Sequence, residues 1–280
     1  MTDSIIYITK ADGERELFRE TKLRQSLKKA GATAQEIQNI TDTIRASLVD
    51  GMTTEIIYRK AFEILRGSAE PLAARYSLRR ALFGLGPTGF PFEDYLTRLF
   101  QHDGYKTKTR LVAKGNCGIH ELDVVAYTPT DTVIVEAKFH QQPGVKTDMQ
   151  VILYTHARFL DLKSRKVHTK DETSIRRSMV VTNTKFTKAA IDYAECAGVS
   201  LISWDYPRKG NLQDWIERSG LFPVTVLSGL NGREKTALMQ SGAILCNDVI
   251  DNHQLLSSVG VSKSKIQAVM DESVKICLPA

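Results

Sequence analysis

The chain has 280 residues, of which 42% are hydrophobic and 25% charged, as is usual for a globular protein of two or three domains. No apolar run approaches the ~20 residues that cross a membrane, and the N-terminus lacks a basic-plus-apolar signal pattern. We therefore expect a cytoplasmic protein with no membrane partner. The four cysteines are scattered without a Cys-x-x-Cys pair, which argues against disulfides and structural zinc.

The net charge of +6 is spread unevenly along the chain. Residues 1–85 carry 14 basic and 11 acidic side chains, and residues 86–220 carry 19 and 16. Residues 221–280 carry five of each. The first two segments are therefore suited to a polyanionic partner, whereas the neutral last segment argues against a strong grip on phosphates.

The first 85 residues predict a small β-hairpin followed by four helices. Turn residues separate two short strands, and apolar residues then recur at helical spacing between breakers. The strands are expected over 4–9 and 14–18, and the helices over 21–30, 34–48, 55–66 and 71–85. Thr54 stands at the start of the third helix, where it is a natural N-cap.

Five stretches of this segment carry a resemblance to a known family. They are Ile8–Gly13, Glu16–Phe18, Lys22, Asp50–Thr54 and Leu72–Arg75. In this order they resemble the ATP-cone, the nucleotide-sensing domain of ribonucleotide reductases and of the repressor that controls their genes. The resemblance implies that ATP or dATP binds between the hairpin and the helices as an allosteric ligand. It also assigns the nucleotide contacts to four residues: Lys10, Glu16, Lys22 and Thr54.

Breakers at 84–91 indicate a domain boundary. The order of elements after it is α-β-β-β-α-β-α-β, which predicts a mixed sheet with helices on both faces. The expected elements are a helix over 92–102, strands over 105–112, 118–127 and 132–139, a helix over 147–162, a strand over 178–182, a helix over 187–197 and a strand over 199–204. We read residues 114–118 as a flexible loop.

The hairpin over 118–139 places charged residues where a sheet does not tolerate them freely. A four-residue turn pairs Tyr127 with Thr132, and this register brings Asp123 opposite Glu136. Glu121 then lies opposite Lys138, and all four charged side chains share one face. Because facing carboxylates repel, a hard divalent cation bound by their oxygens is the simplest explanation.

The spacing of Asp123 from Glu136-Ala137-Lys138 matches the PD-(D/E)xK nuclease core. Further blocks on the expected elements resemble the Mrr-like restriction endonuclease domain: Phe92–Glu93, Asp103–Tyr105, Glu121–Ala126, Val133–Lys138, Val181–Asn183 and Val199–Ile202. The resemblance implies hydrolysis of phosphodiester bonds in DNA, most simply double-stranded DNA.

The chemistry assigns a role to each charged residue of the hairpin. Asp123 and Glu136 are suited to hold Mg²⁺ or Mn²⁺, with the carbonyl oxygen of Ala137 as a third ligand. Lys138 can orient the attacking water and offset negative charge. Glu121 is either a salt-bridge partner of Lys138 or a further ligand.

Two more residues outside the hairpin are candidates for the same site. Glu93 is either an accessory acid or a helix N-terminal charge favoured by the helix dipole. Gln150, on the next helix, could contact the scissile phosphate. His120 and His140 flank the site in sequence, and we read them as non-ligands. The basic run over 163–177 is either a solvated loop or a contact to the phosphate backbone.

The last 60 residues predict a small helical module. Helices are expected over 233–241, 246–252, 253–259 and 262–276. The pattern vaguely resembles a helix-hairpin-helix module, and a packing or oligomerisation role is at least as plausible as DNA contact.

We therefore expect a multi-domain α/β protein: an ATP-cone over 1–85, a linker over 86–91, a nuclease domain over 92–220 and a helical module over 221–280. The expected function is metal-dependent DNA cleavage in restriction or defence, regulated by nucleotide through a homo-oligomer. The alternatives are a nucleotide-sensing DNA-binding regulator that does not cleave, and a nuclease acting on RNA or branched DNA. A zinc-ribbon repressor is disfavoured because the cysteine quartet is missing.

Overall fold

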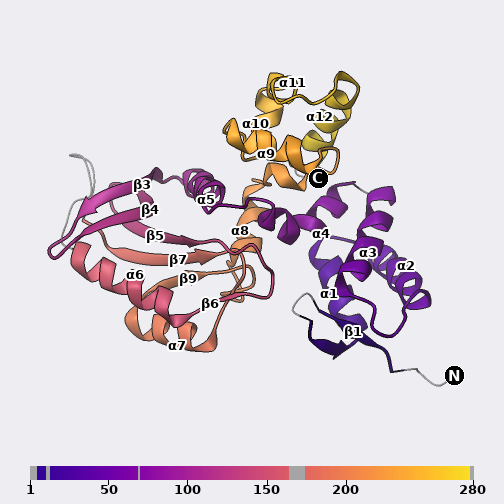
Figure 1. Cartoon of the computed structure of the whole chain (residues 1–280), viewed down its shortest axis with the longest axis horizontal. Helices are drawn as coiled ribbons and strands as arrows, with labels where there is room; N and C mark the ends of the chain where they lie inside the picture. Colours follow the sequence, from indigo (N-terminus) through magenta and orange to yellow (C-terminus); the bar gives the residue numbers. More distant parts are fainter. Residues whose placement is uncertain (1–4, 11–12, 69, 164–173, 278–280) are drawn as a thin grey trace.

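The structure is a computed structural model, and it describes residues 5–10, 13–68, 70–163 and 174–277. A small N-terminal hairpin with four helices lies at one end, and a mixed sheet flanked by helices lies at the other (Figure 1). A group of short helices from the C-terminal part of the chain sits between and above them (Figure 1). Within the described residues, no helix is both long and apolar enough to cross a membrane.

The N-terminal elements follow the predicted order with boundaries shifted by a few residues. The hairpin pairs β1 (Tyr7–Thr9) with β2 (Arg15–Leu17), and turn residues 11 and 12 lie outside the described residues. The helices are α1 (Glu20–Lys29), α2 (Ala34–Ala46), α3 (Thr54–Ser68) and α4 (Glu70–Phe83). Gly31 ends the α1 region with a φ of +92°, a conformation that favours glycine.

The start of α3 corrects one prediction. The residue that caps this helix is Thr53, whose hydroxyl accepts a hydrogen bond from the Ile56 backbone N–H at 3.3 Å. Thr54 is instead the first residue of the helix. A β-bridge joins Thr53 to Thr9, so the cap is fixed to the first strand of the hairpin.

Helix α4 packs into two hydrophobic cores at once. Ala73 belongs to the core of the N-terminal helices. Ala74, Leu78 and Leu82, together with Leu85 just after the helix, belong to a second core, which also contains residues of the central sheet and of the C-terminal helices. The N-terminal domain is therefore joined to the rest of the protein through a buried helix face as well as through the chain.

The linker after α4 is packed against the body of the protein. A Cβ on Gly84 would lie 3.2 Å from the Thr225 side chain, and one on Gly86 would lie 3.1 Å from the Phe139 ring. Gln141 donates a hydrogen bond to the Pro87 carbonyl at 2.6 Å. The next helix, α5 (Phe90–His102), begins at Phe90, inside the span predicted as linker.

The central sheet has the order β3-β4-β5-β7-β9. Strands β3 (Lys106–Lys114), β4 (Ile119–Tyr127) and β5 (Thr132–Lys138) are antiparallel, and β7 (Arg177–Thr182) and β9 (Ser200–Ile202) continue the sheet in parallel. Helices α6 (Met149–Leu162) and α7 (Lys188–Ala197) precede β7 and β9 respectively. The predicted mixed sheet with flanking helices is confirmed.

Three elements of this domain were not predicted. A two-residue pairing joins β6 (Lys146–Thr147) to β8 (Lys185–Phe186), and helix α8 (Leu212–Ser219) follows β9. Helix α8 begins at the cap Asn211 and ends at Gly220 with a φ of +67°. Most of the predicted basic run, residues 164–173, lies outside the described residues.

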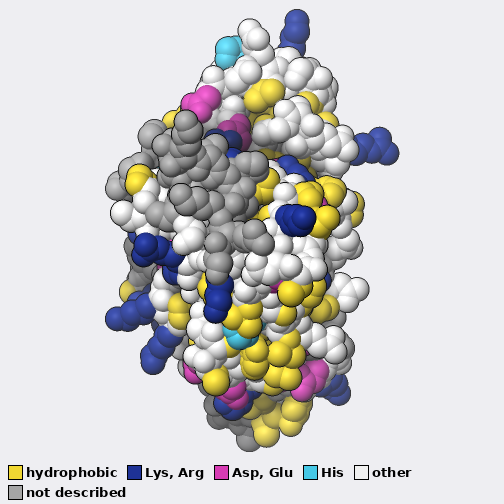
Figure 2. Space-filling view, turned by 90° about the vertical axis from the view of Figure 1, so that its left-hand side faces the viewer, with side chains coloured by type: hydrophobic (Ala, Val, Ile, Leu, Met, Phe, Trp, Pro, Cys, Tyr) yellow, Lys and Arg dark blue, Asp and Glu magenta, His cyan; other side chains and the backbone are white. Residues whose placement is uncertain are grey.

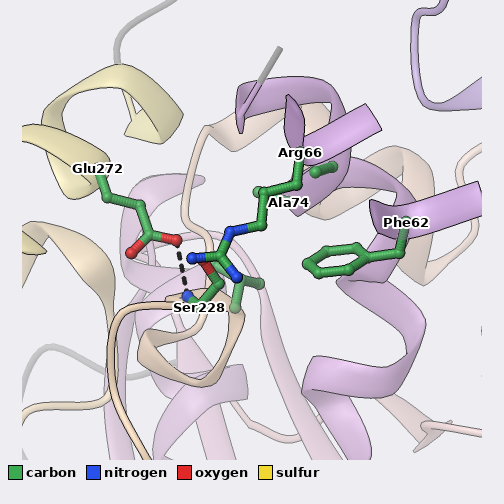
Figure 3. Close-up of a pocket in the computed structure, with 7 residues that line it drawn as sticks. Phe62, Arg66, Ala74, Ser228 and Glu272 are labelled. Carbon is green, nitrogen blue, oxygen red and sulfur yellow. Dashed lines mark hydrogen bonds between the residues drawn. The ribbon is translucent and has the colours of Figure 1, made fainter. Parts of the chain in front are cut away.

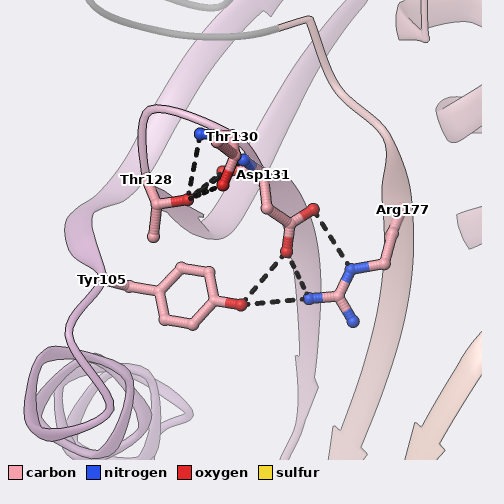
Figure 4. A network of polar contacts seen from close by, with 5 residues as sticks. All are labelled: Tyr105, Thr128, Thr130, Asp131 and Arg177. Carbon is pink, nitrogen blue, oxygen red and sulfur yellow. Dashed lines mark hydrogen bonds and ion pairs between the residues drawn. The ribbon is translucent and has the colours of Figure 1, made fainter.

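A polar network ties the edge of this domain together. Arg177 at the start of β7 bonds both carboxylate oxygens of Asp131, which lies in the β4–β5 turn (Figure 4). The Tyr105 hydroxyl donates to the same carboxylate at 3.1 Å. The network therefore links the chain before β3 to the turn and to β7.

The C-terminal part is helical, as predicted. It contains a 3-10 turn, η1 (Val224–Val226), and helices α9 (Gly232–Gln240), α10 (Cys246–Asp251), α11 (Gln254–Ser258) and α12 (Lys263–Cys277). Glu272 on α12 is buried and accepts hydrogen bonds from the Ser228 and Gly229 backbone N–H groups at 2.6 and 3.0 Å.

The C-terminal helices also contact the N-terminal domain directly. The Thr225 hydroxyl donates to the Ala81 carbonyl of α4 at 2.7 Å. In Figure 3, Arg66 of α3 extends toward Ser228 and Glu272, while Phe62 lines the other side of the same small pocket. The described contacts of this module therefore pack it against the N-terminal domain.

The loop before β4 is held in place, which corrects its reading as a flexible segment. Asp161, near the end of α6, accepts hydrogen bonds from the Cys117 and Gly118 backbone N–H groups at 2.7 and 3.1 Å. The His120 ring is 2.7 Å from the same carboxylate. These bonds, with that to His120 the largest contribution, hold the pKa of Asp161 far below its usual range.

Gly115 is required for this loop to close on Asp161. A Cβ at Gly115 would lie 2.0 Å from Asp161 Oδ2. We expect Gly115→Ala to lower the free energy of unfolding by about 1–3 kcal/mol and to speed tryptic cleavage at Lys114. Thermal unfolding and limited proteolysis measure both effects. Gly118→Ala is the matched control, since its Cβ would lie at an ordinary 3.8 Å from the His120 ring, and equal behaviour of the two variants would contradict the prediction.

Candidate active site

The β4–β5 hairpin has the predicted register, and its strand pairing stops just before Asp123 and Glu136. Tyr127 pairs with Thr132, and the ladder between β4 and β5 continues to Val124 and Val135. Beyond that pair, the Ala137 backbone N–H donates to Asp123 Oδ2 at 2.7 Å. A side chain therefore replaces the next main-chain partner, and the two strands separate at the carboxylates.

The pleat of β4 is broken at Asp123, which corrects the expectation of a single charged face. Leu122 and Val125 pack in one cluster, whereas Val124 and Ala126 pack in another. Residues three apart cannot share a face in a regular strand. Arg110, opposite Asp123 by the register of β3, has a φ of +51°, which costs an ordinary residue about 1 kcal/mol. The kink sits beside the candidate site.

Glu136 is held by an arginine that the sequence did not single out. Arg158 on α6 donates from Nη1 to Glu136 Oε2 at 2.6 Å. The Arg158 side chain is buried, and its guanidinium lies 4.4 Å from the centre of the Tyr154 ring. Gln150, Tyr154 and Arg158 are spaced by four residues and therefore follow one side of α6.

Glu93 approaches Asp123 from helix α5. It is buried near the start of α5, and Arg110 donates to its Oε2 at 3.1 Å. Arg110 also bonds the neighbouring Asp94 at 2.9 Å, so the kinked strand is clamped to the helix. This burial favours an active-site carboxylate over a solvated charge at the helix N-terminus.

The carboxyl groups perturb one another electrostatically. Burial, followed by the negative charge of Glu136, raises the pKa of Asp123 to about 6. Burial, followed by the charge of Asp123, raises the pKa of Glu93 to about 7 in spite of Arg110. Three acidic side chains therefore lie within electrostatic reach, although the sequence places them far apart in the chain.

The remaining candidates occupy different positions around these acids. Lys138 ends β5 and is half-buried, and among the residues that the structure describes it has no ion-pair partner. The suggested salt bridge between Lys138 and Glu121 is absent from the described ion pairs, and Glu121 is exposed on β4. Gln150 is exposed in the first turn of α6, with its backbone N–H capped by Asp148.

The donor atoms at the site suit a hard divalent cation. Each of the two carboxylates has one oxygen engaged, Asp123 Oδ2 by Ala137 and Glu136 Oε2 by Arg158. Over the described ranges, the second oxygen of each carboxylate accepts no hydrogen bond. Repulsion between the acids and two unengaged oxygens fit Mg²⁺ or Mn²⁺. Among the described residues, no group of three or more His, Cys, Asp or Glu side chains is arranged as a complete metal-binding cluster.

The two histidines that flank the site in sequence, His120 and His140, bond protein groups outside it. The His140 ring is 2.9 Å from the Thr147 hydroxyl, and the backbone N–H and carbonyl of His140 both bond the side chain of Asn183. The ring of His120 bonds Asp161, as described above. Both rings therefore bond other protein groups, and their reading as non-ligands stays a prediction.

Three of the four predicted nucleotide contacts, Lys10 and Glu16 of the hairpin and Lys22 of α1, lie close together. Lys22 Nζ lies 3.0 Å from both carboxylate oxygens of Glu16, and Lys10 Nζ lies 3.3 Å from Glu16 Oε2 and 2.6 Å from Glu14. Thr54 follows Thr53, which is bridged to the residue before Lys10. The hydrogen bond from Lys22 lowers the pKa of Glu16. One lysine of the hairpin and one of α1 therefore surround the Glu16 carboxylate.

A cavity of about 410 Å³ lies elsewhere in the same domain. Most of its lining side chains are apolar, among them Ile5 before β1, Leu17 of β2 and Leu48 after α2. None of the four predicted nucleotide contacts lines it. The predicted nucleotide site and this cavity are therefore different places.

Family models match the chain in three consecutive blocks. Residues 6–82 match the ATP cone domain, residues 87–206 match a restriction endonuclease family, and residues 222–277 match the AF1548-like C-terminal domain. An uncharacterized protein of Archaeoglobus fulgidus is 34% identical over 182 residues, which are 65% of this chain and 99% of that protein. The chain belongs to the AF1548-like family.

The family assignment fits the fold and confirms both resemblances. The chain carries an ATP-cone followed by an Mrr-like restriction endonuclease domain of the PD-(D/E)xK superfamily. The crystal structure titled as AF1548, a protein of unknown function, is 32% identical, with a TM-score of 0.56 over 68% of this chain and 98% of that one. The helix-hairpin-helix likeness of the C-terminal module stays a prediction.

A second solved structure has a much lower similarity to this chain. The structure titled MspJI restriction endonuclease in complex with a 27-mer oligonucleotide is 14% identical, with a TM-score of 0.31 over 47% of this chain and 29% of that one.

Sequence reasoning found the acids and the lysine but missed the residues that hold them. Tyr154 and Arg158 lie about one and two helical turns beyond Gln150, respectively, so the four-residue spacing was a usable signal. Arg110 gave no such signal, because its role depends on a backbone conformation that an arginine rarely adopts.

Proposed function

We propose that this AF1548-like chain is a metal-dependent endonuclease that hydrolyses phosphodiester bonds in double-stranded DNA. The observation that carries the proposal is the pair Asp123 and Glu136, each with one oxygen engaged by the protein and one left for a ligand. Lys138 ends the same strand as Glu136. Membership of a restriction endonuclease family supports the reaction class and makes a role in restriction or defence the natural one.

Each residue has a defined task in this reaction. Asp123 and Glu136 would hold the cation, with the Ala137 carbonyl as a further oxygen ligand. When bound, Mg²⁺ or Mn²⁺ supplies Lewis-acid polarisation and a more acidic water. Lys138 would orient the attacking water and offset the charge that develops on the phosphate. Glu93, with its pKa near 7, is suited to exchange a proton at neutral pH.

The surface around the site is suited to a polyanion. Figure 2 shows the end of the molecule formed by β3, β4 and α6, from which Lys and Arg side chains project. Apolar side chains gather in the lower part of the same view. Strand β3 carries Lys106, Lys108, Arg110 and Lys114 and no acidic residue. Gln150 and Tyr154 are exposed on α6, in the two turns before the buried Arg158, where a phosphate backbone would meet them.

The cleavage assay separates this proposal from its rivals. We expect purified protein to nick or linearise plasmid DNA with Mg²⁺ and to leave it intact in EDTA. Single-stranded DNA, RNA and a branched junction serve as competing substrates, and Glu136→Gln is the inactive control. Binding of plasmid without cleavage in any divalent cation would contradict the enzyme and favour a DNA-binding regulator.

We further propose that ATP or dATP binds the ATP-cone and controls cleavage by shifting an oligomeric equilibrium. The two cores along α4 support this route. A conformational change in the ATP-cone would reach the nuclease domain through the buried side chains of this helix. Light scattering with and without each nucleotide tests the oligomer. An unchanged mass and an unchanged cleavage rate with both nucleotides would exclude this form of control.

Lys22→Ala tests the nucleotide site itself. If Lys22 binds a phosphate, its loss weakens ATP binding about tenfold, because a hydrogen bond to a charged group contributes roughly 1.5–3 kcal/mol. Isothermal titration calorimetry measures the affinity. Lys28→Ala is the matched control, since Lys28 is an exposed lysine in the last turn of the same helix. Equal ATP affinity in the two variants would remove Lys22 from the site.

A further inference from the structure

Arg158 on α6 is a charged residue buried in the nuclease domain. Its side chain is 8% exposed, and its Nη1 lies 2.6 Å from Glu136 Oε2. The Arg158 Nε is also buried and has no hydrogen-bond partner among the described residues. Because burying a guanidinium is unfavourable unless it is paired, its position next to two acids calls for an explanation.

We propose that Arg158 is a positioning residue that acts as the internal counter-cation of the Asp123–Glu136 pair. It would hold Glu136 by one oxygen and offset the repulsion between the carboxylates whenever no divalent cation is bound. This inference rests on the proposed metal-dependent function, since it concerns the same two acids.

The geometry supports a positioning role in two ways. The bond to Oε2 leaves Oε1 as the unengaged oxygen of Glu136, so the rotamer of this ligand is set before a cation arrives. The ring of Tyr154, 4.4 Å from the guanidinium, supports Arg158 in turn. A planar guanidinium supplies directional donors on a rigid fork, which the ammonium group of a lysine does not.

The charge of Arg158 makes a second, measurable difference. Arg158 and a divalent cation would neutralise the same carboxylates, so their stabilising effects on the folded protein overlap. Removing the positive charge should therefore destabilise the metal-free protein more than the metal-bound protein. A residue that only fills space would lower the stability of both forms equally.

The test compares thermal unfolding of the full chain in EDTA and in Mn²⁺. We expect Arg158→Gln to lower the Tm in EDTA by about 5 °C, with most of the loss recovered in Mn²⁺. The rise in Tm on adding Mn²⁺ is then larger in the variant than in the wild type. Arg158→Lys keeps the charge and should restore the wild-type response to Mn²⁺.

Arg98→Gln is the matched control for this experiment. Arg98 on α5 pairs with Asp248 on α10 at 2.8 Å, outside the candidate site. Its loss should lower the Tm equally in EDTA and in Mn²⁺. The same uniform loss in Arg158→Gln would overturn the inference, because Arg158 would then be a packing residue.

Two further outcomes are decisive. If Mn²⁺ shifts the Tm of neither wild type nor Arg158→Gln, the inference fails, and wild-type cleavage in Mn²⁺ shows whether the proposed function survives. If Arg158→Gln does not fold, the double variant Glu136→Gln with Arg158→Gln replaces it. We expect that neutral pair to fold and to gain nothing from Mn²⁺, and a double variant that also fails to fold would overturn the inference.

Discussion

Lys138→Met should lower the rate of plasmid cleavage about 10²–10³-fold while leaving the Tm unchanged. The activity falls because the variant loses the positive charge that offsets the developing charge on the phosphate. The stability is preserved because, within the described part of the chain, Lys138 has no ion pair to lose. Initial rates of supercoiled plasmid loss, measured beside thermal unfolding, check both halves of this prediction.

Lys188→Met is the matched control for Lys138. Lys188 is an exposed lysine on α7 of the same domain, and it pairs with Asp192 one turn away. Its loss should change neither cleavage nor Tm. If Lys138→Met cleaves as fast as Lys188→Met, Lys138 has no role in the reaction and the PD-(D/E)xK assignment of this residue fails.

Asp123→Asn should inactivate the enzyme and stabilise the metal-free protein at neutral pH. The pKa of Asp123 is about 6 in the folded protein, above that of the unfolded chain, because of burial and then the charge of Glu136. The ionised carboxylate therefore opposes folding, and stability falls as the pH rises from about 4 to 6. Asparagine can still accept the Ala137 N–H without the charge, so we expect a gain of about 2 kcal/mol at pH 7.

Denaturant unfolding of both proteins in EDTA, at pH 4 and pH 7, measures this effect. The stability of the variant relative to wild type should grow between the two values. Asp131→Asn is a control of opposite sign, since hydrogen bonds from Arg177 lower the pKa of Asp131 in spite of its burial. A loss of stability in Asp123→Asn would mean that the acids do not repel in the metal-free protein.

The local pattern of the sequence was sufficient to predict most elements. In the C-terminal region, helix α9 was expected to begin at 233 and begins at Gly232, after an Asn231 capping box. The turn of four residues between β4 and β5 set the register correctly, because turn length and alternation agree there. Helix α8 was missed although its signals, Asn211 before it and Gly220 after it, are ordinary ones.

The site was harder to predict where it depends on tertiary structure. Asp123, Glu136 and Lys138 are close in sequence and carry a recognisable spacing. The break in the pleat at Asp123 could not be predicted, since it depends on Arg110 adopting a positive φ and bonding Glu93 on another element. The pairing of Arg158 with Glu136 likewise joins residues 22 positions apart through the packing of α6 on the sheet.

The two packed faces of α4 have a consequence for how this protein can be divided. A cut after residue 85 takes Leu78, Leu82 and Leu85 away from the core that they share with the nuclease domain. A cut before α4 instead removes Ala73 from the N-terminal core. No single cut next to this helix leaves both hydrophobic cores complete. A nucleotide sensor moved to another protein would therefore need both packed faces of α4 redesigned to fit their new neighbours.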